Sequence, residues 1–73
     1  MLIRADFDRL YDLTVGALRS GALSQAEDFI FQMEDIVDEL PQGDDDEVEV
    51  ATTAFYIVCI LDSCLTEERH KLN

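Results

Sequence analysis

Two turn signals divide the chain, and they constrain its fold more than any other feature. One is Gly21, and the other is the segment 40–44, which contains Pro41 and Gly43. Glycine favours the left-handed conformation that ends a helix, and proline cannot continue one. On either side of these signals, apolar residues recur at steps of three and four, the period of a helix with one buried face. The sequence therefore predicts three helices, over about residues 2–19, 25–40 and 46–66.

Each predicted helix has an apolar stripe that we expect to face a common core. In the first helix the stripe comprises Ile3, Phe7, Leu10, Tyr11, Thr14, Ala17 and Leu18. In the second, which we expect to begin at a capping box of Ser24 and Glu27, it comprises Ala26, Phe29, Ile30, Met33, Ile36, Val37 and Leu40. In the third, which we expect to begin at an Asp cap within residues 44–46, it comprises Val50, Ala51, Ala54, Phe55, Ile57, Val58, Leu61, Cys64 and Leu65. This third stripe covers more than half of the circumference, so the third helix is expected to be the most buried.

The third segment is also rich in β-branched and aromatic residues, so a strand over residues 53–60 is the alternative. A run of about twenty residues without glycine or proline is longer than most strands, and acids at its start with basic residues at its end suit a helix dipole. We therefore predict an all-α protein. It is expected to form a small three-helix antiparallel bundle in which residues 1–73 make a single acidic helical domain.

The charge balance limits what this domain can bind. Seventeen Asp and Glu face five Lys and Arg, the formal net charge is −12, and no Lys or Arg lies between Arg19 and Arg69. A protein that binds nucleic acid or an anionic membrane needs Lys and Arg near the phosphates, so we expect neither ligand. We expect a basic protein as the partner, because an acidic surface speeds encounter with a cationic one. A chain of 73 residues has little room for a catalytic cleft, so we expect neither an enzyme nor a bound cofactor.

Cysteine usage and hydropathy indicate a cytoplasmic protein. Cys59 and Cys64 are turned about 140 degrees from each other on a helix, so we expect two buried free thiols. Neither these thiols with the single His70 nor the acids of residues 44–47 have the spacing of a zinc or calcium site, so we expect no metal. No secretory signal is visible, and the longest apolar run, Phe55–Leu61, is too short to span a bilayer.

The carboxylates of the second helix are the strongest candidate for a binding site. They point away from its apolar stripe, and this helix has no Lys or Arg. A solvated face is the simpler interpretation, but solubility does not require one sign of charge over so much surface. Phe31 lies among these carboxylates and, unless residues 44–48 cover it, is the kind of aromatic that anchors protein interfaces. The predicted partner-binding residues are Glu27, Asp28, Phe31, Glu34, Asp35 and Asp38.

Two further predictions concern the third helix. Tyr56 and Ile60 lie opposite its main stripe, so they are either buried between the other helices or form a second interface, for which a symmetric homodimer is the expected form. Asp62 lies inside the main stripe, where a carboxylate must be paired or protonated. We expect Arg4 or Arg9 to be its partner.

By size and charge alone, the chain is similar to the small acidic proteins that phages, plasmids and toxin loci use to occupy a basic site on a larger protein. Carboxylates spaced along a rigid helix stand in for phosphates, because both accept hydrogen bonds from Arg and Lys. The favoured hypothesis is a small acidic inhibitor or regulator of a basic, nucleic-acid-handling protein, of the DNA-mimic, phage anti-defence or toxin-immunity type. The alternative is a structural or adaptor subunit that dimerises or docks through its third helix.

Overall fold

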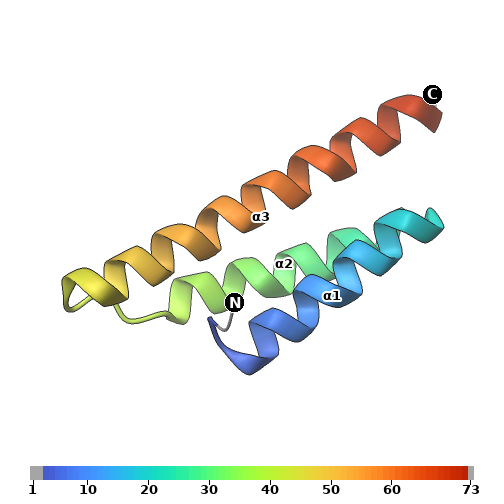
Figure 1. The fold of residues 1–73 in the computed structure, drawn as a ribbon. Helices are drawn as coiled ribbons and strands as arrows, with labels where there is room; N and C mark the ends of the chain where they lie inside the picture. Colours follow the sequence, from blue (N-terminus) through green and yellow to red (C-terminus); the bar gives the residue numbers. More distant parts are fainter. Residues whose placement is uncertain (1–2, 73) are drawn as a thin grey trace.

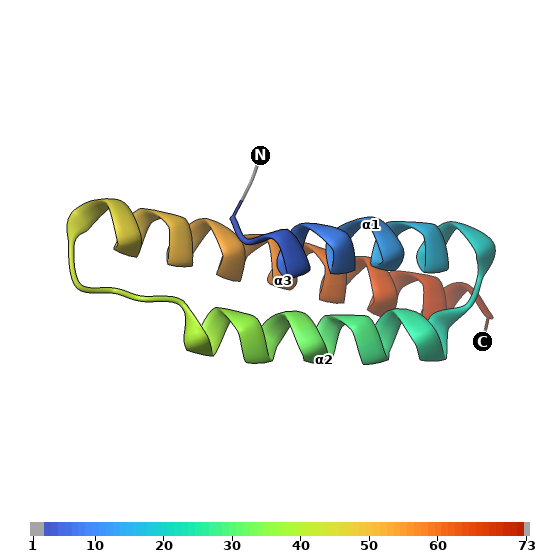
Figure 2. The same ribbon diagram turned by 90° about the horizontal axis from the view of Figure 1, so that it is seen from below.

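The computed structural model describes residues 3–72. Its three helices are α1 (Ala5–Ser20), α2 (Leu23–Glu39) and α3 (Asp45–Leu72) (Figure 1). α2 runs antiparallel to α1 and α3, and the helices lie side by side in an elongated bundle 44 Å long (Figure 2). The predicted all-α class and three-helix bundle are therefore confirmed. No strand occurs in residues 3–72, so the strand alternative for the third segment is wrong.

The turn between α1 and α2 is fixed by Gly21. Its φ of 79° lies in the left-handed region, which glycine adopts without steric cost. The N–H of Gly21 donates to the carbonyl of Leu18 at 3.4 Å, and the N–H of Ala22 donates to that of Ala17 at 2.9 Å. This is the Schellman arrangement of hydrogen bonds, which satisfies carbonyls at the end of α1 and reverses the chain.

The capping box predicted at Ser24 and Glu27 is wrong. α2 begins at Leu23, its N-cap residue is Ala22, and no side chain caps it. The N–H of Leu23 donates to the carbonyl of Gly21 at 3.0 Å, so the glycine turn leads directly into the helix. Ser24 therefore lies inside the first turn of α2, where its hydroxyl is not in a capping position.

The reciprocal cap occurs at α3 instead, where an Asp cap was predicted. The N–H of Glu47 donates to Oδ1 of Asp44 at 2.8 Å, and the N–H of Gly43 donates to Oε1 of Glu47 at 3.1 Å. The first hydrogen bond satisfies a backbone donor that the first turn of a helix leaves free, and the second ties the residue before the cap to Glu47. α3 continues to Leu72, six residues beyond its predicted end at residue 66.

The core lies between the facing stripes of the three helices. Thr14 is the buried polar residue among them, and its hydroxyl donates to the carbonyl of Leu10 at 2.6 Å, so it lacks no hydrogen bond. The buried apolar residues are Phe7, Ala17, Ala26, Ile30, Met33, Ile36, Leu40, Ala51, Ala54, Val58, Leu61 and Leu65.

The wide buried face predicted for α3 is wrong. Phe55 and Val50 are exposed, while Ile57 and Cys64 are half-buried. The reason is tertiary: α1 packs on α2 and contacts α3 very little, so α3 has one close neighbour. A stripe of only about 80 degrees is covered as a result. Its residues recur at steps of three and four and are Ala51, Ala54, Val58, Leu61 and Leu65.

The limited contact of α1 with α3 also exposes Tyr11, which was predicted to face the core. α3 is the longest helix, about 42 Å at 1.5 Å per residue, and its first turns extend past the end of α2 (Figure 2). Val48 and Val50 lie in the first two turns of α3 and are exposed.

We predict that Leu65→Ala lowers the free energy of unfolding by about 2–5 kcal/mol, because it leaves a cavity where α3 packs on the bundle. Leu13→Ala is the control, since Leu13 is exposed on α1, and is expected to cost less than about 1 kcal/mol. Urea unfolding followed by circular dichroism measures both. Equal effects would show that the C-terminal half of α3 is not packed as described.

A second prediction compares the two candidate caps. Asp44→Ala removes the acceptor of the Glu47 N–H and is expected to destabilise the protein by about 0.5–2 kcal/mol. Ser24→Ala is expected to have little effect or to stabilise slightly, since alanine has the higher helix propensity. Thermal unfolding of the two variants decides the matter, and a larger loss for Ser24→Ala would contradict the cap assignment.

Candidate functional site

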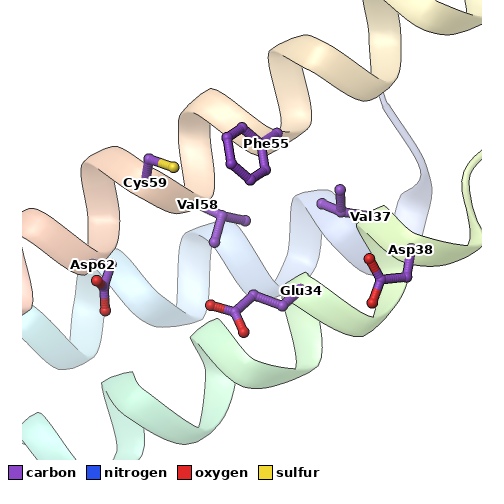
Figure 3. Close-up of a pocket in the computed structure, with 7 residues that line it drawn as sticks. All are labelled: Glu34, Val37, Asp38, Phe55, Val58, Cys59 and Asp62. Carbon is purple, nitrogen blue, oxygen red and sulfur yellow. The ribbon is translucent and has the colours of Figure 1, made fainter.

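A groove between α2 and α3 brings acidic and apolar side chains from both helices together (Figure 3). We call it the α2–α3 groove. Its volume is about 270 Å³, which is below the roughly 300–1,000 Å³ of clefts that hold small molecules and cofactors. The lining residues are Glu34, Val37 and Asp38 of α2 and Phe55, Val58, Cys59 and Asp62 of α3.

Helix geometry explains why these side chains meet. Glu34 and Asp38 are four residues apart, so they lie one above the other along the flank of α2 that faces α3. On α3, Phe55 and Asp62 are seven residues apart and therefore share the corresponding flank. Val58 is buried and forms the floor, while the carboxylates lie at the edges, as Figure 3 shows.

No basic side chain lines the α2–α3 groove. The ion pairs within residues 3–72 lie at the ends of the bundle instead. Arg69 of α3 pairs with Glu27 near the start of α2 at 2.8 Å, and Arg4 pairs with Glu39 at the end of α2 at 3.1 Å. The middle of the groove therefore has a negative potential, with no cation among the residues of 3–72 that line it.

Two exposed carboxylates near the helix ends are paired locally. Arg4 also donates to Asp6, and this hydrogen bond lowers the pKa of the Asp6 carboxyl below its usual value. Lys71 donates to Glu68 at 3.2 Å, which raises the pKa of the lysine. Both pairs are open to solvent, so they anchor the side chains locally and contribute little to stability.

The predicted partner-binding residues of α2 are not all on one surface. Phe31 is 55% exposed, so residues 44–48 do not cover it. Glu34 and Asp38 line the α2–α3 groove, and Phe31 precedes Glu34 by one helical turn. Asp28 is exposed as well.

The remaining two carboxylates of this set lie elsewhere. Asp35 lines a separate groove between α1 and α2, together with Arg4 and Arg9, so it belongs to a surface that contains cations. Glu27 is half-buried and is occupied by its ion pair with Arg69. The negative surface open to a partner is therefore narrower than the whole outer face of α2.

The burial and pairing predicted for Asp62 are wrong. Asp62 is exposed at the edge of the groove, and it pairs with neither Arg4 nor Arg9. Because only about 80 degrees of α3 is covered, a residue at the margin of the apolar stripe remains in water. Phe55, which is 57% exposed, is in the same position. Sequence reasoning assigned both residues to the core, so it missed them as site residues.

Tyr56 and Ile60 are 63% and 61% exposed, which excludes the alternative that they are buried between the other helices. Cys59 is exposed and Cys64 is half-buried, so the prediction of two buried thiols is wrong although both are free. Within residues 3–72, no three His, Cys, Asp or Glu side chains converge as metal ligands.

Among the described residues, α3 is also the one helix whose length and composition would allow it to cross a membrane. The core helix of a soluble protein meets the same two criteria, but such a helix is mostly buried. Here 28% of the most apolar 18 residues are buried. α3 therefore exposes more apolar surface than a core helix does.

A third groove lies between α1 and α3, the two helices that contact each other least. Phe7, Tyr11 and Ile57 supply its apolar lining, and Asp8 and Asp12 supply carboxylates from α1 alone. It contains none of the predicted site residues.

Comparisons with protein-family models, with curated proteins and with solved structures find no match to this chain.

We predict that Asp62→Asn changes the free energy of unfolding by less than about 0.5 kcal/mol, because the carboxylate is in water and has no cation to lose. Removing one member of a buried ion pair would cost roughly 3–5 kcal/mol. Leu61→Ala, at the neighbouring buried position, is the positive control and is expected to cost about 2–5 kcal/mol. Urea titration measures the free energy of unfolding of the wild type and of both variants. A loss of stability for Asp62→Asn close to that for Leu61→Ala would show that Asp62 is buried after all.

Proposed function

We propose that this chain is a small protein-binding inhibitor or regulator that holds a basic surface of a larger protein against the α2–α3 groove. The composition of the groove carries the proposal: its floor is apolar, its edges are three carboxylates from two helices, and none of its lining residues is basic. A partner that presents an apolar side chain flanked by Lys or Arg complements this groove in both shape and charge.

Phe31 extends the proposed site along α2. Phe31, Glu34 and Asp38 follow each other at steps of three and four, so they form one line on the helix next to the groove. An exposed aromatic ring beside carboxylates provides an apolar anchor that Arg or Lys of the partner surrounds. The helix holds this line rigidly, which reduces the conformational entropy lost on binding.

The class of partner follows from charge. Carboxylates accept the same forked hydrogen bonds from Arg as phosphates do, and a protein that handles nucleic acid keeps such cations on one surface. The net charge of −12 attracts that surface over long range. We therefore propose a nucleic-acid-handling protein as the partner, with occupation of its binding surface as the means of inhibition.

The test compares two double variants, each of which removes two negative charges from a different part of the surface. Glu34→Gln/Asp38→Asn removes them from the groove, and Asp12→Asn/Glu49→Gln removes them from α1 and from the start of α3. Each immobilised protein captures proteins from a lysate of the source organism, with washes at roughly 0.1 M and 1 M salt, where the screening length falls from about 10 Å to about 3 Å. We expect the groove variant to lose a basic partner that wild type and control retain at low salt.

The captured protein is then purified, and its binding is measured by calorimetry with wild type, with Phe31→Ala and with a competing DNA duplex. We expect Phe31→Ala to weaken the Kd at least about tenfold, as for an interface anchor, and the duplex to displace the protein. Equal loss in both double variants would mean that overall charge, not the groove, binds the partner. A partner that salt and DNA leave bound would refute the mimicry of nucleic acid.

A further inference from the structure

α3 has a second apolar stripe on the side away from its buried residues. All its members are exposed, and they recur at steps of three and four within about 17 Å of helix. None is charged, in a chain in which 30% of the residues are charged. We call it the outer stripe, and it consists of Thr52, Phe55, Tyr56, Cys59, Ile60 and Ser63.

The two ends of α3 differ in charge, because its Lys and Arg residues lie at its C-terminal end, where Glu67 and Glu68 precede them. Its first turn contains Asp45, Asp46 and Glu47, and its last turn contains Arg69, His70 and Lys71. Two parallel copies of α3 would place acid against acid at one end and base against base at the other. Two antiparallel copies instead place the acidic first turn of each copy near Arg69 and Lys71 of the other.

A single antiparallel register satisfies both the stripe and the charges. With its centre between Ile57 and Val58, Thr52 lies opposite Ser63 of the second copy, so the two outer stripes overlap fully. In that register Asp45 lies opposite His70 of the second copy. Both of these residues lie within about 20 degrees of the middle of the outer stripe on the helix circumference, so they face the same way as the stripe.

We propose that α3 pairs with α3 of a second copy of this chain, antiparallel, around a two-fold axis that passes between Ile57 and Val58. The contact is isologous, because each copy contributes the same outer stripe. The stripe itself is too short for a stable interface, which covers roughly 800 Å² on each partner. The antiparallel register adds the charged turns at both ends, so the contact extends along about 42 Å of helix.

A lipid bilayer is a poorer occupant of the outer stripe. Asp62 and Glu49 lie beside the outer stripe on α3, so a bilayer that covered the stripe would also reach these carboxylates. A carboxylate in the hydrocarbon region is costly.

The dimer leaves much of the α2–α3 groove open. Tyr56 and Ile60 lie on the side of the outer stripe away from the groove, whereas Phe55 and Cys59 border both surfaces. Glu34 and Asp38 lie on α2 and are not part of the stripe. Dimerisation therefore does not depend on the proposed function, and either can fail without the other.

The first test measures mass by sedimentation equilibrium between about 1 and 100 μM, with circular dichroism as a check on folding. Wild type is expected at twice the monomer mass of 8.3 kDa. Tyr56→Glu/Ile60→Glu is expected to weaken the dimer at least about 100-fold, because charge replaces apolar contact on both copies. Leu13→Glu, at an exposed apolar position of α1, is the control and is expected to dimerise as wild type does.

A monomeric wild type over this range would overturn the proposal, and so would a folded Tyr56→Glu/Ile60→Glu variant that dimerises normally. Wild type that stays monomeric in solution but sediments with phosphatidylcholine vesicles would assign the outer stripe to a bilayer instead.

The second test examines the register. His70→Glu places like charges opposite each other twice in the dimer and is expected to weaken it by roughly threefold to tenfold at low salt. Asp45→Lys/His70→Glu places a positive charge opposite each introduced glutamate and is expected to restore the wild-type Kd. A double variant that is as weak as His70→Glu or weaker would contradict the antiparallel register, because in a parallel pair the exchanged residues face their own copies.

Discussion

The contact between α2 and α3 is a narrow seam of apolar side chains, and its narrowness determines which sides of α3 are exposed. Ala51 and Ala54 are small enough to let the helices approach closely, and Val58, Leu61 and Leu65 fill the space along the rest of the seam. Because α1 packs on α2 and contacts α3 little, most of the surface of α3 away from α2 is not covered by any helix in residues 3–72. One flank of α3 therefore borders the acidic groove, and the far side exposes the outer stripe.

Two of the few cations of the chain join the helices near the ends of the bundle. Arg69 joins the end of α3 to Glu27 on α2, and Arg4 joins the start of α1 to Glu39 at the other end of α2. Each exposed pair contributes little alone. Their placement nevertheless leaves the middle of the α2–α3 surface with carboxylates only, which is where the candidate site lies. The same few cations that hold the helix ends thus define the position of the open negative surface.

Sequence periodicity was sufficient for the helices but not for the surfaces between them. Steps of three and four, Gly21 and an Asp cap within residues 44–46 predict three helices because each signal is local. The core position predicted for Phe55 and Asp62 failed because periodicity identifies the side of a helix that is apolar, and the number of neighbours decides how much of that side is covered. The exposure of Phe31 was predictable, since it lies among carboxylates far from its own stripe. The choice of Ser24 as a cap failed because the turn at Gly21 leads into α2 before Ser24 is reached.

The central claim is that a basic partner binds where carboxylates of α2 and α3 border one apolar groove. The most direct measurement is an amide NMR titration of the isotopically labelled chain with the captured partner, at low salt and again at high salt. The account predicts the largest shifts at Phe31, Glu34, Asp38, Phe55 and Asp62, and their reversal at high salt. Shifts confined to α1, or shifts at the groove that high salt leaves unchanged, would contradict it.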